Sequence, residues 1–133
     1  MLFSLVLSLL FHPLAFAQLE SSSVSASTIL QTQISWDGKQ IEYPSGTPEI
    51  TGMVIEIAVG GETGWHKHSA PSFAMIVQGE LEVHLRDGRV NRLKAGDMLA
   101  EVVDTWHNGH NVGDVPVKLA VFGQVLTEAD EPH

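Results

Sequence analysis

The chain has 133 residues, a formal net charge of -9 at neutral pH and no cysteine. The excess of acidic groups repels phosphate backbones, which argues against nucleic acid as a partner. Without cysteine there is no disulfide, no thiolate metal site and no cysteine nucleophile, so a bound metal must be held by histidine and carboxylate.

Residues 1–17, MLFSLVLSLLFHPLAFA, are mostly apolar, contain no charged side chain and end in Ala15-Phe16-Ala17, a pattern that signal peptidase accepts. The stretch has no basic start. Pro13 nevertheless interrupts it too early for a spanning helix, which needs about 20 apolar residues. We therefore expect a signal peptide that is removed before Gln18. The mature protein would be periplasmic or secreted and would not contact the membrane.

The rest of the chain predicts one folded domain between two short terminal segments. Residues 18–28 are rich in serine and predict a flexible leader, and the folded part is expected at 29–127. Residues 128–133 form an acidic tail, and the final stretch TEADEPH predicts a frayed end or a short turn.

Within the folded part the pattern predicts short strands, and no stretch shows a helical period. Residues 37–38 and 86–89 carry the Asp-Gly signal of tight turns. Several short strands at close spacing predict an all-β antiparallel sandwich or barrel. Strands are expected at 33–36, 40–43, 50–59, 72–78, 81–85, 90–93, 98–103 and 117–126.

Two histidines stand one residue apart in TGWHKHSAPSFAMIVQGE, residues 63–80. Residues i and i+2 of a strand point to the same face, so His66 and His68 project together and Lys67 turns away. By itself this pair is compatible with a metal clip or with two neighbouring surface histidines. A third histidine, His107, follows in AGDMLAEVVDTWHNGHN.

Together the two segments resemble the two sequence motifs of the cupin family. In the first, Gly60 is followed after five residues by the HxH pair, and the motif ends at Gly79. In the second, Gly96 precedes His107, and Asn111 follows after three more residues. A hairpin is expected between the motifs, and the resemblance extends over about residues 50–122.

The resemblance implies a small single-domain cupin, an antiparallel double-stranded β-helix with a jelly-roll-like barrel. It further implies an internal metal site lined by His66, His68 and His107. Three neutral imidazoles hold a borderline metal and leave positions open, so we expect a divalent ion of Fe, Mn, Zn, Ni or Cu and a small-molecule ligand. By the same resemblance a homodimer is expected.

Two departures from the family pattern affect this site. Ser72 stands where the family has a metal-binding Glu. Val102 and Asp104 replace the Pro and Gly of the second turn. The usual set of three histidines and one glutamate is therefore incomplete.

Glu101 is the candidate catalytic residue. If His107 faces inward, strand alternation puts Leu99 and Glu101 on the inner face, where a carboxylate needs a metal, a histidine or a proton. Glu101 would then be a substitute fourth ligand or a general acid/base beside the metal. The alternative is that the altered turn shifts the register by one residue and turns Glu101 to solvent.

Alternation also sorts the neighbouring side chains. Ser72, Ala74 and Ile76 are expected on the inner face and leave room for a ligand. The opposite face of that strand is apolar too, which predicts cover by the N-terminal strands or by a second copy of the chain. His84 and His110 are expected to lie outside the ligand set. Trp65 and Trp106 each precede a candidate ligand and are expected either to be packed or to line the pocket mouth.

Three functions remain open. The first is a metal-dependent enzyme: three histidines without a ligating carboxylate resemble the dioxygenase-like cupins, and ligation by Glu101 would resemble the isomerases and lyases. The second is a non-catalytic module that binds a metal or a small molecule. The third, a metal-free domain with a hydrogen-bonded histidine core, fits the joint motifs least well.

Overall fold

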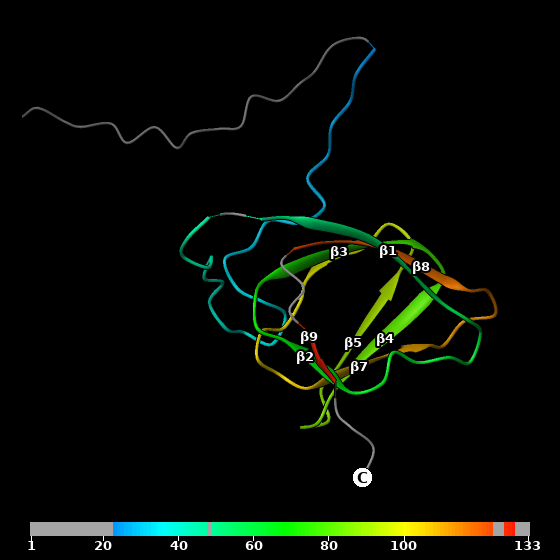
Figure 1. Ribbon diagram of the computed structural model, residues 1–133. Helices are drawn as coiled ribbons and strands as arrows, with labels where there is room; N and C mark the ends of the chain where they lie inside the picture. Colours follow the sequence, from blue (N-terminus) through cyan, green and yellow to red (C-terminus); the bar gives the residue numbers. More distant parts are fainter. Residues whose placement is uncertain (1–22, 48, 124–126, 130–133) are drawn as a thin grey trace, which may run out of the picture.

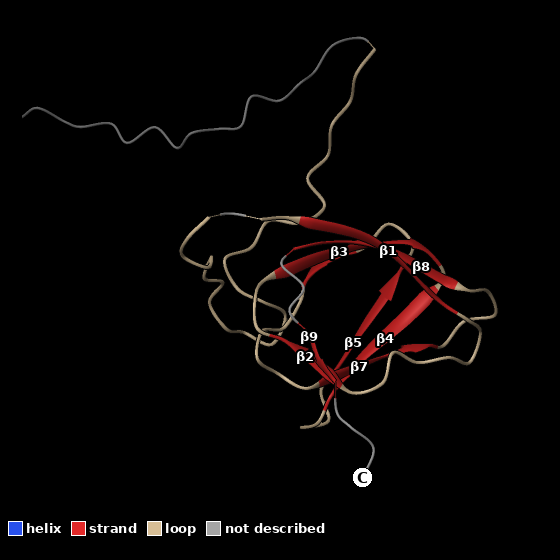
Figure 2. Cartoon of the chain, viewed as in Figure 1, coloured by secondary structure: helices blue, strands red, loops and turns tan. Residues whose placement is uncertain are grey.

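The computed structural model describes residues 23–47, 49–123 and 127–129. The predicted signal peptide, residues 1–17, lies outside the described residues. In the described part the secondary structure consists of nine strands with antiparallel pairing and contains no helix (Figure 2). Accordingly, these residues contain no helix that could cross a membrane.

Two sheets face each other and enclose the core (Figure 1). One sheet has the strand order β1-β8-β3-β6 and the other β5-β4-β7-β2-β9. The strands are β1 (Thr51–Ile57), β2 (His66–His68), β3 (Ser72–Gln78), β4 (Glu80–Leu85), β5 (Val90–Lys94), β6 (Met98–Ala100), β7 (His107–Asn111), β8 (Val117–Gly123) and β9 (Thr127–Ala129). The prediction of an all-β antiparallel fold is confirmed.

Period-two alternation decides which side chains enter the core. On β4 the apolar residues Leu81, Val83 and Leu85 are buried, and Glu82 and His84 lie on the opposite, outer face. The inner face of β3 follows the same rule. Because the inner faces of both sheets are apolar, their side chains meet in one cluster: Ile57, Ala74, Ile76, Leu81, Val83, Leu93, Leu99, Val117, Leu119 and Val121.

Most predicted strands are present, with differences at their ends. The strand predicted at 72–78 has these bounds, and those predicted at 81–85 and 90–93 each gain one residue. The strand predicted at 98–103 ends at Ala100, and the fully buried Val102 lies beyond its end.

The two ends of the described chain differ more from the prediction. Around the Asp37-Gly38 turn, the expected hairpin is reduced to one bridge between Ile34 and Gln40. The frayed end or turn predicted for the C-terminal stretch is wrong for Thr127–Ala129, which pair with β2 as β9. Backbone pairing along the β2 edge overrides the polar composition of this stretch.

The outer face of the four-stranded sheet is apolar, as expected. Phe73 and Met75 are half-buried, whereas Val77 is 59% and Phe122 54% exposed. A pocket at the Phe73 and Phe122 end of this face is lined on its other side by Tyr43, Pro44, Ser45, Thr47, Glu49 and Ile50. Cover of this face by the N-terminal strands or by a second copy of the chain stays a prediction.

Gly79, the last glycine of the first motif, joins β3 to β4 at a position that excludes a side chain. Its φ is +88°, and an added Cβ would lie 3.0 Å from Pro116 O and from Val117 Cα. Gly88 has a similar φ of +94° with nothing within 4 Å of an added Cβ. A side chain at Gly88 would meet only backbone strain, whereas a side chain at Gly79 would meet both strain and a steric clash.

We expect Gly88→Ala to lower the free energy of unfolding by about 1–2 kcal/mol through its φ alone. Gly79→Ala adds a backbone clash and should lower it by about 3 kcal/mol. Urea denaturation of both variants measures the difference. Equal losses would contradict the close approach of β8 to Gly79.

Candidate metal centre

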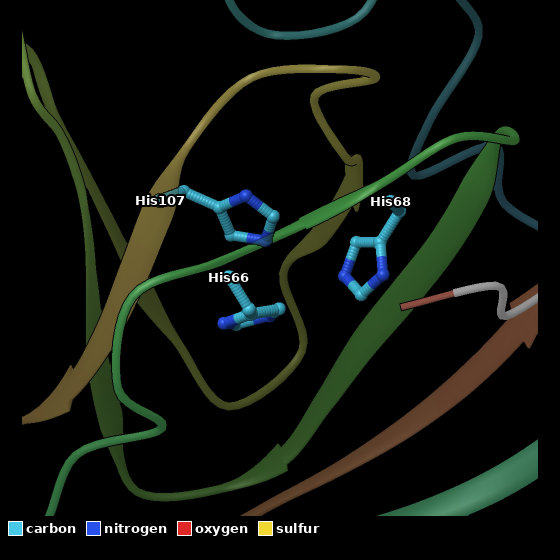
Figure 3. Close-up of side chains that lie close together, drawn as sticks. All are labelled: His66, His68 and His107. Carbon is cyan, nitrogen blue, oxygen red and sulfur yellow. The ribbon is translucent and has the colours of Figure 1, made fainter. Parts of the chain in front are cut away.

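Three histidines from two paired strands meet inside the barrel (Figure 3). His66 and His68 lie on β2, and His107 begins β7 directly opposite His66 in the antiparallel register. The ring centroids are 4.3 Å apart for His66 and His107, 4.9 Å for His66 and His68, and 5.0 Å for His68 and His107. One candidate ligand atom from each residue lies within 4.8 Å of the other two. The structure thus brings together the three histidines expected from the sequence.

Backbone carbonyls orient two of the three rings. Nδ1 of His66 lies 2.8 Å from Gly64 O, and Nδ1 of His107 lies 2.9 Å from Thr105 O. A carbonyl oxygen can only accept, so we infer that each Nδ1 carries the proton and each Nε2 keeps its lone pair. Metal-binding histidines are oriented in this way, so the donor chemistry fits a metal.

Burial also favours the neutral, ligating form of these rings. It lowers the pKa of His68 from 6.5 to about 4, helped by repulsion from charge on His107 and His66. Burial likewise lowers the pKa of His66, although its hydrogen bond to Gly64 O and the nearby Glu101 oppose the shift. A cation would therefore not have to displace a proton from either ring at neutral pH.

The metal-free protein should lose stability as the pH falls from about 6.5 to about 4. In this window the unfolded chain protonates His68 and the folded protein does not, so the unfolded state binds more protons and stability rises with pH. Below the folded pKa both states are protonated and the contribution levels off. In urea melts, His68→Gln should reduce the slope of unfolding free energy against pH; an unchanged slope would contradict the burial of this ring.

The histidines line a small and mainly apolar cavity with about 80 Å³ of free space. One water needs roughly 10–15 Å³ of such space, so the cavity suits a molecule of few non-hydrogen atoms. Besides the histidines, its polar lining residues are Thr63, Ser72 and Glu101. The remaining walls are Met53, Ile55, Ile57, Ala74, Leu81, Val83, Gly109, Leu119 and Val121.

The two departures from the family motifs have different consequences in the structure. Ser72 is buried at the cavity wall, where the motif would place a carboxylate. Asp104 takes the left-handed conformation, with φ +50°, at the position where the motif has Gly. Asp tolerates this region better than most residues, and its backbone N–H donates to His68 O at 2.7 Å. This hydrogen bond holds the altered turn against β2 beside the histidines.

Glu101 faces the cavity, so of its two predicted orientations the structure has the inward one. Its side chain is 14% exposed, and its Oε2 lies 3.9 Å from Nε2 of His107. Its Oε1 accepts hydrogen bonds from the Trp36 indole N–H and from the Val102 backbone N–H, both at 2.9 Å. Glu101 thus stands beside the histidine trio with one oxygen fixed and the other aimed at His107.

The remaining histidines named from the sequence lie on the outer face of the five-stranded sheet. His84 contacts Glu82 at 2.8 Å, and His110 contacts Glu62 at 3.3 Å. Their rings are 4.5 Å apart. These two histidines are not among the residues that line the cavity.

Trp65 and Trp106 also lie away from the cavity lining. The Arg86 guanidinium lies over both rings, 5.4 Å from the centroid of Trp65 and 4.8 Å from that of Trp106. Lys67, expected on the face opposite its histidine neighbours, lies 5.5 Å from the Trp106 centroid. Trp65 and Trp106 were expected either to be packed or to lie at the pocket mouth, and these contacts favour packing.

Trp36 contacts the candidate site residue Glu101, and the sequence did not indicate this contact. It was assigned to a predicted strand, and no local pattern links it to Glu101, which is 65 residues away. The only available signal was chemical: an inward carboxylate needs hydrogen-bond donors, and tryptophan supplies one.

The fold and the site together define a double-stranded β-helix barrel with a potential metal-ligand set in its interior. Residues 53–123, more than half of the chain, match the cupin domain family, so the chain belongs to that family. A search of curated proteins found no match.

Solved structures show the same fold at low sequence identity. A double-stranded β-helix protein from Klebsiella pneumoniae subsp. pneumoniae is 24% identical (TM-score 0.55), over 65% of this chain and 78% of that one. A cupin-like protein from Thermotoga maritima is 16% identical (TM-score 0.56), over 61% and 64%. An oxalate decarboxylase from Lactobacillus farciminis is 23% identical (TM-score 0.55), over 60% of this chain but 26% of its own length. At such identities the similarity shows the fold.

Proposed function

We propose that the protein is a metal-dependent enzyme that transfers a proton on a small molecule, as isomerases and lyases do. The observation that carries this proposal is the inward Glu101 carboxylate, 3.9 Å from the Nε2 of a histidine in the trio. A carboxylate beside an open metal site in an apolar cavity has the position of a general acid/base.

His66, His68 and His107 would hold the metal through one ring nitrogen each. When bound, a divalent ion would act as a Lewis acid on a substrate oxygen. This ligand set fits Fe, Mn, Zn, Ni or Cu.

Other side chains of the cavity would transfer the proton and exclude water. Both donors to Glu101 bind Oε1, so Oε2 is the oxygen available to take a proton from the substrate or return it. The aliphatic walls exclude bulk water and limit the substrate to a small molecule. None of the described lining residues is Lys or Arg, so an anionic substrate would find no side-chain countercharge there.

A second candidate is dioxygenase-like chemistry. It is favoured by the grouping of three histidines into one potential ligand set that does not include Glu101. In a non-catalytic module, by contrast, Glu101 would close the metal shell as a fourth ligand, and no position would remain for a substrate.

The test begins with elemental analysis of untagged mature protein. Small neutral carbonyl and hydroxy compounds are then screened for deuterium uptake from solvent, with dioxygen consumption followed in parallel. Metal near one per chain and deuterium exchange support the proposal. Dioxygen consumption without exchange supports the second candidate, and a metal-loaded protein with neither activity supports a binding module.

Export and homodimerisation are further proposals. Export is supported by the sequence of residues 1–17. The homodimer is supported by the resemblance to the family and by the partly uncovered outer face around Val77 and Phe122. Mass spectrometry of the mature N-terminus and light scattering of the purified protein test them.

A further inference from the structure

The N-terminal turn, defined here as residues 33–41, lies outside the part of the chain that matches the family and yet reaches the metal centre. Backbone hydrogen bonds from Ser35 N–H to Lys39 O (2.8 Å) and from Ile41 N–H to Gln33 O (2.9 Å) close it. The Trp36 N–H donates to Ala100 O at 3.1 Å, which places the turn beside the residue that precedes Glu101.

Side chains fasten the same turn to the loop that leads into His107. Lys39 Nζ donates to Thr105 Oγ1 at 2.8 Å, and Thr105 Oγ1 donates to Asp37 Oδ2 at 3.3 Å. Thr105 also supplies the carbonyl that orients His107. The turn is therefore anchored to the chain before Glu101, at Ala100, and after it, at Thr105.

From this anchored position the Trp36 indole reaches Glu101. The ring packs against the buried apolar cluster, and its N–H donates to Glu101 Oε1 at 2.9 Å. The other donor to this oxygen is the N–H of the adjacent Val102. A long carboxylate side chain held by one neighbouring backbone donor keeps rotational freedom, which a second, rigid donor removes.

We propose that Trp36 is a positioning residue that aims Oε2 of Glu101 at His107. Trp36 lies outside the region that matches the family, residues 53–123, and contacts Glu101 inside it. The inference deepens the proposed function and rests on it where cation binding is concerned, whereas the placement of Glu101 against His107 can be measured without a metal.

The experiment compares Trp36→Phe, Glu101→Ala and the double variant with the wild type. Trp36→Phe keeps a ring in the apolar cluster and removes the N–H donor. Trp65→Phe is the matched control, because Trp65 lies away from the cavity. Thermal unfolding establishes that each variant is folded.

The first readout is Co²⁺ affinity by titration. We expect Trp36→Phe to weaken binding by about tenfold, as losses of partners outside the ligand shell do, and Trp65→Phe to leave it unchanged. In the Glu101→Ala background Trp36→Phe should cause no further loss, because its effect passes through Glu101. The same tenfold loss in both backgrounds would show a merely structural role and overturn the inference.

The second readout is the ring nitrogen resonances of His107 in metal-free, ¹⁵N-histidine-labelled protein. Trp36→Phe and Glu101→Ala should shift them in the same direction, and Trp65→Phe should not. If the wild type bound no Co²⁺, the proposed function would fail and this readout alone would decide: common shifts would support the positioning role, and an unmoved His107 in Trp36→Phe would overturn it.

Discussion

Replacing His66 and His107 together by alanine should abolish stoichiometric metal binding and leave a folded barrel. The double variant removes two of the three imidazoles from the trio, one from each contributing strand. We expect the affinity to fall by more than about 100-fold, the upper limit for losing an outer partner alone. Neither residue belongs to the buried apolar cluster that joins the two sheets, so the fold should persist.

Elemental analysis and circular dichroism of the purified variant check this expectation. The chain offers a matched control in His84→Ala with His110→Ala, which removes two adjacent histidines from the outer face. The control should keep metal near one per chain. Full occupancy in the His66/His107 variant, or loss of metal in the control, would refute the site.

Glu101→Gln should lower kcat by roughly 10²–10⁴-fold on the substrate that the exchange screen identifies. The amide has the shape of the carboxylate, and its oxygen can still accept from the Trp36 indole and the Val102 backbone. It cannot take up the proton that Oε2 would carry. Steady-state kinetics give the size of the effect.

The metal content at saturating metal and the unfolding midpoint are the controls for this variant, and both should match the wild type, although the metal affinity should fall as it does in Trp36→Phe. Unchanged kcat would exclude a proton-transfer role for Glu101. Loss of metal together with activity would instead make Glu101 a ligand and argue against an acid/base role.

Local patterns predicted the parts of the structure that depend on neighbouring residues. Alternation alone placed Ser72, Ala74 and Ile76 on the inner face of β3, where the structure has them buried. The i, i+2 spacing placed His66 and His68 side by side for the same reason. Adding His107 required the family resemblance, because the pairing of β2 with β7 joins residues far apart in the sequence.

Other features depend on contacts that a local pattern does not contain. The orientation of Glu101 depends on a turn in which Asp104 accepts a conformation usual for glycine. The strand β9 forms because the edge of β2 offers a backbone partner. Trp36 enters the site through hydrogen bonds to residues more than 60 positions away, which a strand-like pattern at 33–36 cannot indicate.

In the candidate metal centre, the residues that could bind the cation and the residue that positions Glu101 come from different parts of the chain. The three histidines and Glu101 all lie within residues 53–123, whereas the side chain that holds Glu101 toward them lies before that range. A chain with a different segment before residue 53 would therefore keep the three histidines and Glu101 and lose the indole contact to Glu101. Exchange of this segment would change the position of the carboxylate and leave the set of candidate ligands intact.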